Sequence, residues 1–163
     1  LSTILAELDG LAEKGRGDLF VLTIAATNRP WDLDPAVLSR FDKKILIPLP
    51  DPETREAILK ITILDRGYET EFDDLLDLVA LTEGLSGREI DRLVKEVSNQ
   101  MVMEKNADIV ALVDQGLDQV RNYEVKSRPL TLKDFRDASQ RIHPVTSEED
   151  MKKYSDWKDS DDE

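Results

Sequence analysis

A short apolar run, Leu19–Ala26, stops at the polar tetrapeptide Thr27-Asn28-Arg29-Pro30. The run is too short for a typical buried helix and is rich in residues that favour strands. It therefore predicts a strand covered on both faces, as in a parallel sheet. The proline ends this strand, because the residue before a proline is pushed away from helical geometry. A second short segment, Lys44–Pro48, predicts another strand, so the N-terminal part of the chain is expected to be α/β.

Helix signals precede, separate and follow these two segments. Leu1–Leu11 carries apolar residues at helical spacing, and Asp34-Pro35 predicts the start of a short helix through Leu38. After Pro50 the pattern becomes almost purely helical. Further helices are expected from Asp51-Pro52 to Gly67, from Phe72 to Gly84, from Ser86 with a buried stripe of Ile90, Leu93, Val94, Val97 and Met101, from Thr131 to Ile142, and from Ser147 to Trp157.

The charge of the chain limits the partners that it can have. A formal net charge of −13 and a pI near 4.5 argue against a duplex-binding domain, so no nucleic acid is expected and a helical DNA-binding domain is disfavoured. No apolar run approaches the roughly 20 residues of a membrane span. The start is not a signal peptide, and a cytoplasmic protein is expected. With no cysteine and His143 as the one histidine, no metal site is predicted within the chain.

Two polar side chains are candidates for chemistry. Asn28 follows the carboxyl end of the first predicted strand, where parallel sheets place ligand-contacting residues. Its amide could orient a water or touch a phosphate oxygen without adding charge; alternatively, Asn-Arg-Pro simply forms a turn. Arg40 follows the short helix and is either an arginine finger that completes a phosphate site or an ordinary solvated arginine.

An ordered series of segments resembles the AAA ATPase family, from the helix after the Walker B strand to the end of the helical lid. The series consists of Leu8-Asp-Gly10, Ala26-Thr-Asn-Arg-Pro30, Leu33-Asp-Pro35, Arg40-Phe-Asp42, Ile47-Pro-Leu-Pro-Asp-Pro-Glu-Thr-Arg55 and Gly84-Leu-Ser-Gly-Arg-Glu-Ile90. Together the segments cover most of residues 1–144. The Leu-Ser-Arg-Phe join, the Ile-Pro-Leu-Pro strand end and the C-terminal helix are most similar to the branch that contains katanin, spastin and the ATPase that disassembles ESCRT filaments.

The resemblance implies a domain organisation. Residues 1–50 would be the C-terminal part of the large α/β subdomain, a partial parallel sheet of a P-loop NTPase, and residues 51–144 an all-α helical lid. Within the lid, residues 108–126 are either an insertion or an ordinary extension of a helix interrupted near Gly116. Residues 145–163 would be a C-terminal helix and an acidic tail. That helix either packs on the large subdomain or a neighbour, or is a simple terminal amphipathic helix.

The resemblance also implies roles for the two candidate residues. Asn28 matches sensor 1, which helps to place the attacking water near the ATP γ-phosphate. Arg40 matches the arginine finger that reaches into the site of the neighbouring subunit. Ser39 stands where many members of the branch carry a second arginine, which argues against a two-finger clamp.

The lid carries the remaining predicted cofactor contacts. Gly84, Ser86 and Gly87 match the lid segment near the adenine and its sugar. Arg88 stands where more distant relatives keep a sensor 2 arginine, so it either contacts the γ-phosphate or is a solvated residue at a helix start. Ser86 and Glu89 also form a capping-box signature, which is compatible with a nucleotide role.

The Walker A loop with its lysine and the Walker B acids, which bind ATP and Mg²⁺ in this family, do not occur in the 163 residues. Because the sequence lacks an initiator Met and begins inside a helical pattern, we expect it to be part of a longer protein. That protein would bind ATP and Mg²⁺ and form a hexameric ring that remodels, unfolds or disassembles protein complexes. The present chain alone is expected to bind no cofactor and to be inactive. The alternative is a catalytically degenerate AAA-like interaction module that supplies Arg40 to active partners.

Overall fold

The computed structural model describes residues 3, 6, 22–109 and 123–159. The chain forms two compact units, Leu1–Ile47 with Ser147–Glu163 and Pro48–Thr146. Residues 3 and 6 are helical, and the rest of the predicted helix Leu1–Leu11 lies outside the described residues. The predicted interruption near Gly116 lies outside them as well. No described helix is both long enough and apolar enough to cross a membrane.

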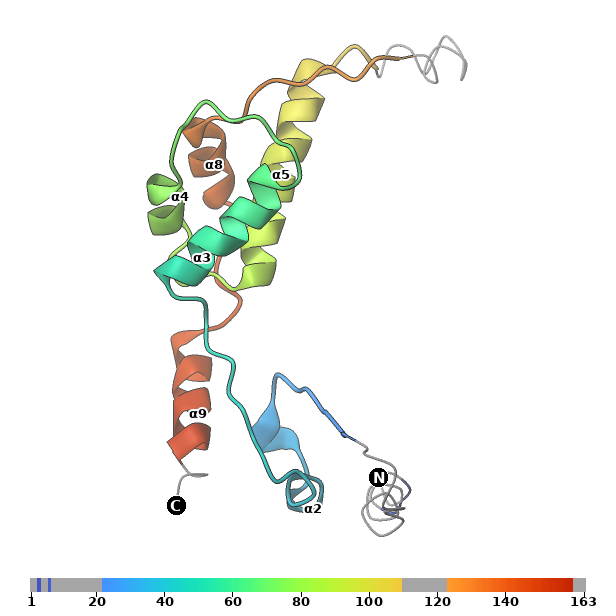
Figure 1. Ribbon diagram of the computed structural model, residues 1–163, viewed down its shortest axis with the longest axis vertical. Helices are drawn as coiled ribbons and strands as arrows, with labels where there is room; N and C mark the ends of the chain where they lie inside the picture. The colour runs from blue at the N-terminus through green and yellow to red at the C-terminus, as the bar shows by residue number, and fades with distance from the viewer. Residues whose placement is uncertain (1–2, 4–5, 7–21, 110–122, 160–163) are drawn as a thin grey trace. The chain divides into compact units, whose positions relative to one another are not determined.

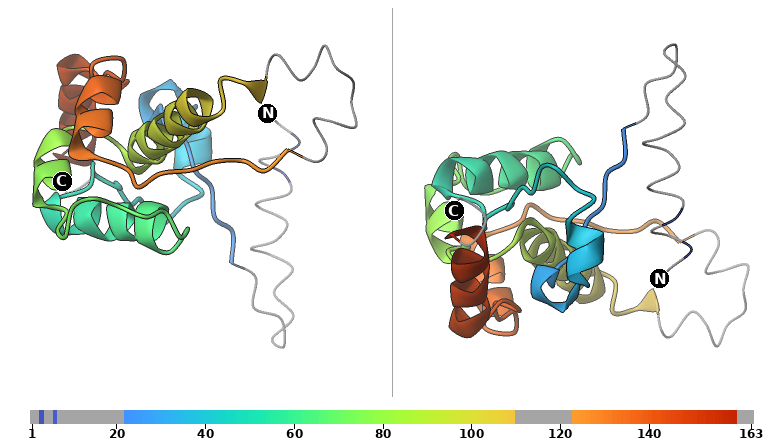
Figure 2. Two further views of the ribbon diagram at one scale, coloured as in Figure 1. Left: turned by 90° about the horizontal axis from the view of Figure 1, so that it is seen from above. Right: turned by 90° about the horizontal axis from the view of Figure 1, so that it is seen from below.

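The second unit is built from helices (Figure 1). They are α3 (Pro52–Leu59), which continues into the π-helix η2 (Lys60–Leu64), α4 (Leu76–Leu81), α5 (Gly87–Lys105) and α8 (Leu132–Ser139). The long helix α5 contacts α3 and α8, and α4 contacts the same two helices. Figure 2 shows the four α-helices gathered around one core from two further directions.

The core of this unit lies along one face of α5. The predicted stripe is confirmed, because its five members are all buried: Ile90, Leu93, Val94, Val97 and Met101. Leu59, Ile63, Leu78 and Phe135 meet this stripe from the surrounding elements. The rings of Phe72 and Phe135 pack edge to face, with their centroids 6.0 Å apart.

Side-chain caps fix where these helices begin. The Asp51 carboxylate accepts a hydrogen bond of 2.7 Å from the Thr54 N–H, and Pro52 follows it as the first helical residue. Capping boxes start α5 at Ser86 and α8 at Thr131. Each of these starts was predicted from the sequence and is confirmed.

The ends of two predicted helices are also confirmed. Gly67 and Gly84 have φ values of 78° and 75°, a left-handed conformation that favours glycine. The helix predicted from Phe72 was placed too early, because α4 begins at Leu76. Phe72 owes its partial burial to packing against the core and not to a place on a helix.

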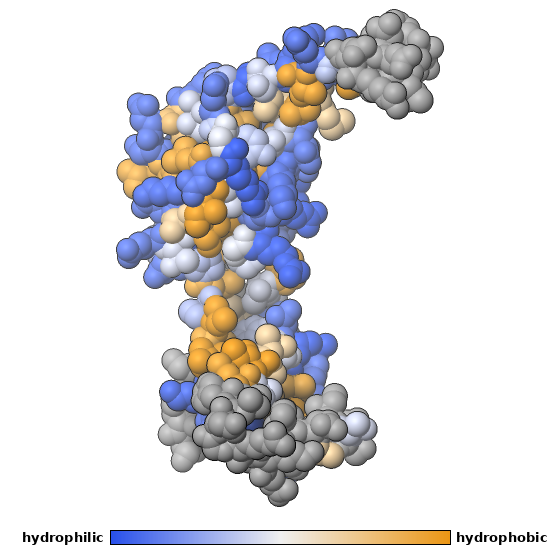
Figure 3. Space-filling model, turned by 45° about the vertical axis from the view of Figure 1, so that its right-hand side comes forward, coloured by the Kyte–Doolittle hydropathy of each residue, from blue (hydrophilic) through white to orange (hydrophobic). Residues whose placement is uncertain are grey.

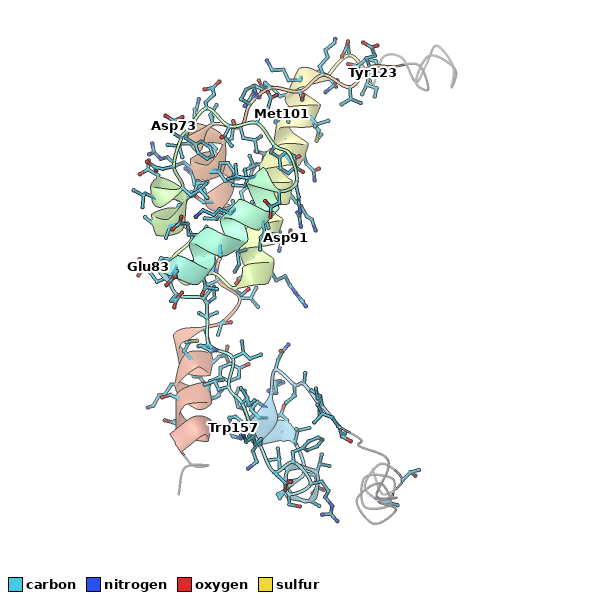
Figure 4. The ribbon with its side chains drawn as sticks, in the orientation of Figure 1. Asp73, Glu83, Asp91, Met101, Tyr123 and Trp157 are labelled. Carbon is cyan, nitrogen blue, oxygen red and sulfur yellow. The ribbon has the colours of Figure 1, made fainter. Side chains whose placement is uncertain are left out.

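Side-chain hydrogen bonds join the end of α5 to residues 123–130. Asn106, at the end of the helix, bonds both backbone groups of Lys126. The Tyr123 hydroxyl donates a hydrogen bond of 2.6 Å to Asp108, which lies just after the end of α5. Figure 4 labels Tyr123, and Met101 near the end of this helix. An isolated parallel bridge pairs Thr70 with Leu130.

The first unit contains the short 3₁₀ helix η1 (Pro30–Asp32), α2 (Pro35–Leu38) and α9 (Glu148–Asp159). The predicted start of α2 is confirmed, since the Asp34 side chain accepts a hydrogen bond of 2.8 Å from the Ala36 N–H. The predicted helix from Ser147 is confirmed by α9. Ser147 and Asp150 bond each other's backbone N–H groups at the beginning of this helix.

The predicted strands are not confirmed. Residues 22–26 and 44–48 form no strand, and residues 19–21 lie outside the described part of the chain. Ile24, Ile45 and Ile47 are 80 %, 78 % and 86 % exposed, which differs from the expected burial on both faces. A strand is held by hydrogen bonds to a neighbouring strand, and neither segment pairs with one among the described residues. The all-α part of the predicted fold is therefore observed, whereas the partial sheet is not.

Figure 3 shows apolar patches, in orange, on a mostly hydrophilic surface.

Candidate functional site

Asn28 lies in a bend two residues before η1 begins, and the residue is exposed. The backbone next to it is held locally, because the Thr27 hydroxyl oxygen accepts a hydrogen bond of 3.0 Å from the Arg29 N–H. A second contact comes from far along the chain, where the Tyr154 hydroxyl donates to the backbone carbonyl of Asn28. The structure thus joins the C-terminal helix to the residue that the sequence predicts as a water-orienting amide.

Aromatic packing accompanies this hydrogen bond. The rings of Trp31 and Tyr154 lie 5.0 Å apart between centroids, with an interplanar angle of 60°. This edge-on arrangement is a favoured geometry for an aromatic pair. Trp157 lies further along the same helix (Figure 4). The sequence predicts the helix from Ser147 to Trp157, but no local pattern indicated that Tyr154 on this helix would meet Asn28 and Trp31.

Arg40 follows α2, and its side chain folds back onto that helix. One guanidinium nitrogen, Nη1, donates to the Ala36 carbonyl at 3.0 Å and to the Ser39 hydroxyl at 3.1 Å. The Ser39 hydroxyl in turn donates to the same carbonyl at 3.0 Å. Both Ser39 and Arg40 are exposed. The position where the branch often has a second arginine therefore holds a hydroxyl that contacts the guanidinium.

The predicted lid segment forms the turn between α4 and α5. Gly84 is exposed, its φ is 75°, and a Cβ there would meet no atom within 4 Å. Gly87 opens α5, and a Cβ on it would lie 3.4 Å from the Ile58 side chain. Ser86 donates its N–H to Glu89 at 2.7 Å, and its hydroxyl accepts the Glu89 N–H at 3.4 Å. Both groups of Ser86 are thus engaged in starting the helix.

Glu89 has a role beyond the predicted capping box. Its Oε2 accepts the Ser86 N–H, while its Oε1 accepts the Val145 N–H at 2.6 Å. The residue is only 5 % exposed. Burial raises the pKa of the carboxyl, but hydrogen bonds from Ser86 and Val145 outweigh this effect and leave the pKa below its ordinary value. A contact across 56 residues has no local signature, so sequence patterns could not reveal it.

The predicted site residues fall into two groups. Asn28 and Arg40 belong to one unit, and Gly84, Ser86, Gly87 and Arg88 are contiguous in the other. Arg88 is exposed at the start of α5. Within the described ranges, no cluster of three His, Cys, Asp or Glu side chains could hold a metal ion.

The predicted site residues carry chemical groups that can bind the phosphate oxygens of a ligand. An exposed amide and an exposed guanidinium are a neutral and a cationic partner for phosphate oxygens. At Gly84, in the turn before α5, the space where a Cβ would lie is open. The nucleotide roles of all six residues stay predictions.

Comparisons with known proteins identify two matching families. Residues 1–49 match the ATPase family associated with various cellular activities (AAA). Residues 113–160 match the Vps4 C terminal oligomerisation domain.

Similar curated proteins are spastins. The chain is 34 % identical to Spastin of Drosophila willistoni over 153 residues, which are 94 % of this chain and 18 % of that protein. It is 32 % identical to Spastin of Naegleria gruberi over 157 residues, or 96 % and 28 % of the two chains. The present chain thus spans only 18 % to 28 % of the length of these relatives.

Similar solved structures are AAA domains. The FIGL-1 AAA domain in complex with ADP matches with a TM-score of 0.75 and 28 % identity, over 96 % of this chain and 49 % of that one. A structure that describes katanin self-assembly matches with a TM-score of 0.69 and 27 % identity, over 93 % and 56 %.

Proposed function

We propose, since this chain belongs to the AAA family of ATPases, that it is the C-terminal portion of an ATP hydrolase that remodels, unfolds or disassembles protein complexes. One observation carries this proposal: similarity to spastins and to AAA domain structures extends over 93–96 % of the chain. A continuous match across both units is expected of a shared ATPase module and not of one borrowed helical motif.

Two findings support a ring assembly. Residues 113–160 match an oligomerisation domain, and one similar structure concerns the self-assembly of katanin. We propose a hexameric ring of identical subunits that acts on a protein substrate. Residues 1–50 would complete the large subdomain, residues 51–144 would form the lid, and residues 145–163 would supply the C-terminal helix and tail.

The proposed chemistry assigns the predicted residues to two nucleotide sites. Asn28 would orient the attacking water at the ATP bound by its own subunit. Arg40 would stabilise the charge of the transferring phosphoryl group at the neighbouring subunit's ATP. The observed Arg40 conformation, with the guanidinium bonded to the end of α2, would then be the one without a neighbouring ATP, and the side chain would change rotamer to reach that ATP.

The lid would contribute at the base and sugar of the nucleotide. Gly84 has open space where a Cβ would lie, so its backbone could approach the ligand closely, and Gly87 would contribute its backbone beside the Ile58 side chain. Ser86 would contribute indirectly, by capping the start of α5 that faces the nucleotide. Arg88 would reach the γ-phosphate. ATP and Mg²⁺ themselves would be bound largely by Walker motifs outside this chain.

The degenerate interaction module is the less favoured alternative. In both hypotheses Arg40 acts as an arginine finger. They differ in the longer protein, which would carry intact Walker motifs in the enzyme and degenerate ones in the interaction module. The similarity to spastins along nearly the whole chain supports the enzyme. The sequence that precedes Leu1 in the longer protein decides between the two.

ATP hydrolysis by the longer protein tests the proposal. We expect Arg40→Ala to lower kcat on the order of 10³-fold, because an arginine finger acts on the transition state. Asn28→Ala should lower kcat at least about tenfold with little change in nucleotide affinity, as expected of a group that orients the water. Lys43→Ala is the matched control, since Lys43 is an exposed cation three residues from Arg40. A lack of ATPase activity in the wild-type protein would contradict the proposal that it is an ATP hydrolase. A loss of kcat in Lys43→Ala equal to that in Arg40→Ala would contradict the proposed role of Arg40.

A further inference from the structure

The C-terminal helix α9 contacts the Asn28 segment through two kinds of interaction. The Tyr154 hydroxyl donates a hydrogen bond to the backbone carbonyl of Asn28. The Tyr154 ring also packs edge-on against Trp31, three residues further along that segment. The hydrogen bond spans 126 positions of sequence, and both contacts lie inside one compact unit.

The segment around Asn28 has little other support among the described residues. Residues 22–29 are exposed and form neither helix nor strand. The hydrogen bonds that shape the turn are local, from the Arg29 N–H to Thr27 and from the Asp32 N–H to the Arg29 carbonyl. Local bonds of this kind shape a turn without fixing its place in the molecule, so the Tyr154 contact restrains Asn28 in a way that the turn itself does not.

The start of α9 is held firmly enough to present Tyr154. The Asp150 carboxylate accepts hydrogen bonds from the Ser147 hydroxyl at 2.7 Å and from its N–H at 3.2 Å. The same hydrogen bonds from Ser147 lower the pKa of Asp150.

We propose that Tyr154 is a positioning residue for Asn28. By holding the backbone carbonyl, its hydroxyl fixes where the Asn28 amide lies, and the C-terminal helix thereby sets the hydrolysis rate of its own subunit. A group that orients a reacting water must be held within a fraction of an ångström, so the loss of one such restraint lowers turnover. This inference rests on the proposed function, in which Asn28 acts on the attacking water.

The test is Tyr154→Phe in the longer ATPase, because this change removes only the hydroxyl and keeps the ring against Trp31. We expect kcat to fall about three- to tenfold, the equivalent of one net hydrogen bond, with KM for ATP within about twofold of wild type. Lys152→Ala, at an exposed position of the same helix, should leave both parameters unchanged. Sedimentation should show the same assembly for wild type and Tyr154→Phe; a dissociated ring, or unchanged kcat in Tyr154→Phe, would overturn the proposal.

A double-mutant cycle with Asn28→Ala separates positioning from a merely structural role. The Asn28→Ala variant keeps the backbone carbonyl, so the Tyr154 hydrogen bond can still form. If Tyr154 acts through the Asn28 amide, adding Tyr154→Phe to Asn28→Ala causes no further loss of kcat. A full additional three- to tenfold loss would overturn the inference and leave the proposed function intact. Wild-type protein without ATPase activity would instead overturn the proposed function.

Discussion

Asn106 is a buried amide that takes the place of a backbone pairing partner. Its side chain is bonded to both backbone groups of Lys126, accepting the N–H and donating to the carbonyl at 2.8 Å each. It also donates to the Val102 carbonyl at 2.6 Å, and the residue is only 4 % exposed. One side chain therefore satisfies polar backbone groups on both sides of the segment between residues 106 and 126.

Replacing Asn106 with alanine should destabilise the helical unit by about 1–3 kcal/mol, because it removes three partly buried hydrogen bonds, two of them to the backbone of Lys126. Asn99→Ala is the matched control on the same helix. Asn99 is exposed, so this change should alter the free energy of unfolding by less than about 0.5 kcal/mol. Urea unfolding followed by circular dichroism measures both values, and equal effects of the two changes would show that the Asn106 bonds contribute nothing to stability.

The helix starts and the α5 core face are the elements that the sequence predicts best. Asp51, Ser86 and Thr131 act as caps through their own neighbours, so the signal and the structure lie within four residues of each other. The burial of the α5 stripe follows from helical periodicity alone. Local causes of this kind are readable from one sequence.

Elements that depend on distant partners are not predictable in the same way. The apolar segments at 22–26 and 44–48 have strand-like composition, but a strand also needs a neighbour with which to pair. The Glu89 contact with Val145 and the Tyr154 contact with Asn28 join residues 56 and 126 positions apart. For the candidate site, the sequence therefore indicated the residue types, whereas their supporting contacts came only from the structure.

An ion pair joins the start of α8 to the end of α5. Arg128 bonds both carboxylate oxygens of Asp134, at 2.7 and 2.9 Å, and also contacts Glu104 on α5 at 2.9 Å. The hydrogen bond from Arg128 is the largest cause, and with hydrogen bonds from Thr131 it lowers the pKa of Asp134 from 3.8 to about 2 despite the opposing effect of burial. Both charged groups of this pair are mostly buried, with 21 % and 19 % of the side chains exposed.

The lowered pKa of Asp134 makes stability depend on pH. A carboxyl with a depressed folded pKa stabilises the protein above its unfolded value, and here the effect is lost as the pH falls from about 4 through 2. We expect Asp134→Asn to cost on the order of 2 kcal/mol at pH 7, with the gap to wild type narrowing as the pH approaches 2. Asp137→Asn, at an exposed position of the same helix, should show no such gap. Urea unfolding across this pH range measures the difference; a gap of constant size would contradict the ion pair as its cause.

For the whole molecule, the two candidate groups divide the proposed work of hydrolysis. Asn28 and Arg40 lie in the unit formed by the two ends of the chain, and Gly84, Ser86, Gly87 and Arg88 lie in the helical unit. In the proposed ring, Asn28 would serve the ATP of its own subunit, and Arg40 would serve the ATP of the neighbouring subunit. Only the short helix α2 and its flanking residues separate Asn28 from Arg40 in the sequence. Residues 26–50 would then connect the nucleotide site of one subunit to that of its neighbour.

Mixing the two impaired variants of the longer protein tests this division most directly. Asn28→Ala subunits keep Arg40, and Arg40→Ala subunits keep Asn28. In a mixed ring, an Arg40→Ala subunit that receives Arg40 from an Asn28→Ala neighbour has a complete site. If Arg40 acts between subunits, the ATPase activity of the mixture should therefore rise above the average of the two separate variants, in proportion to the fraction of such pairs. Activity that stays at the level of the separate variants, in rings shown to contain both, would contradict the account.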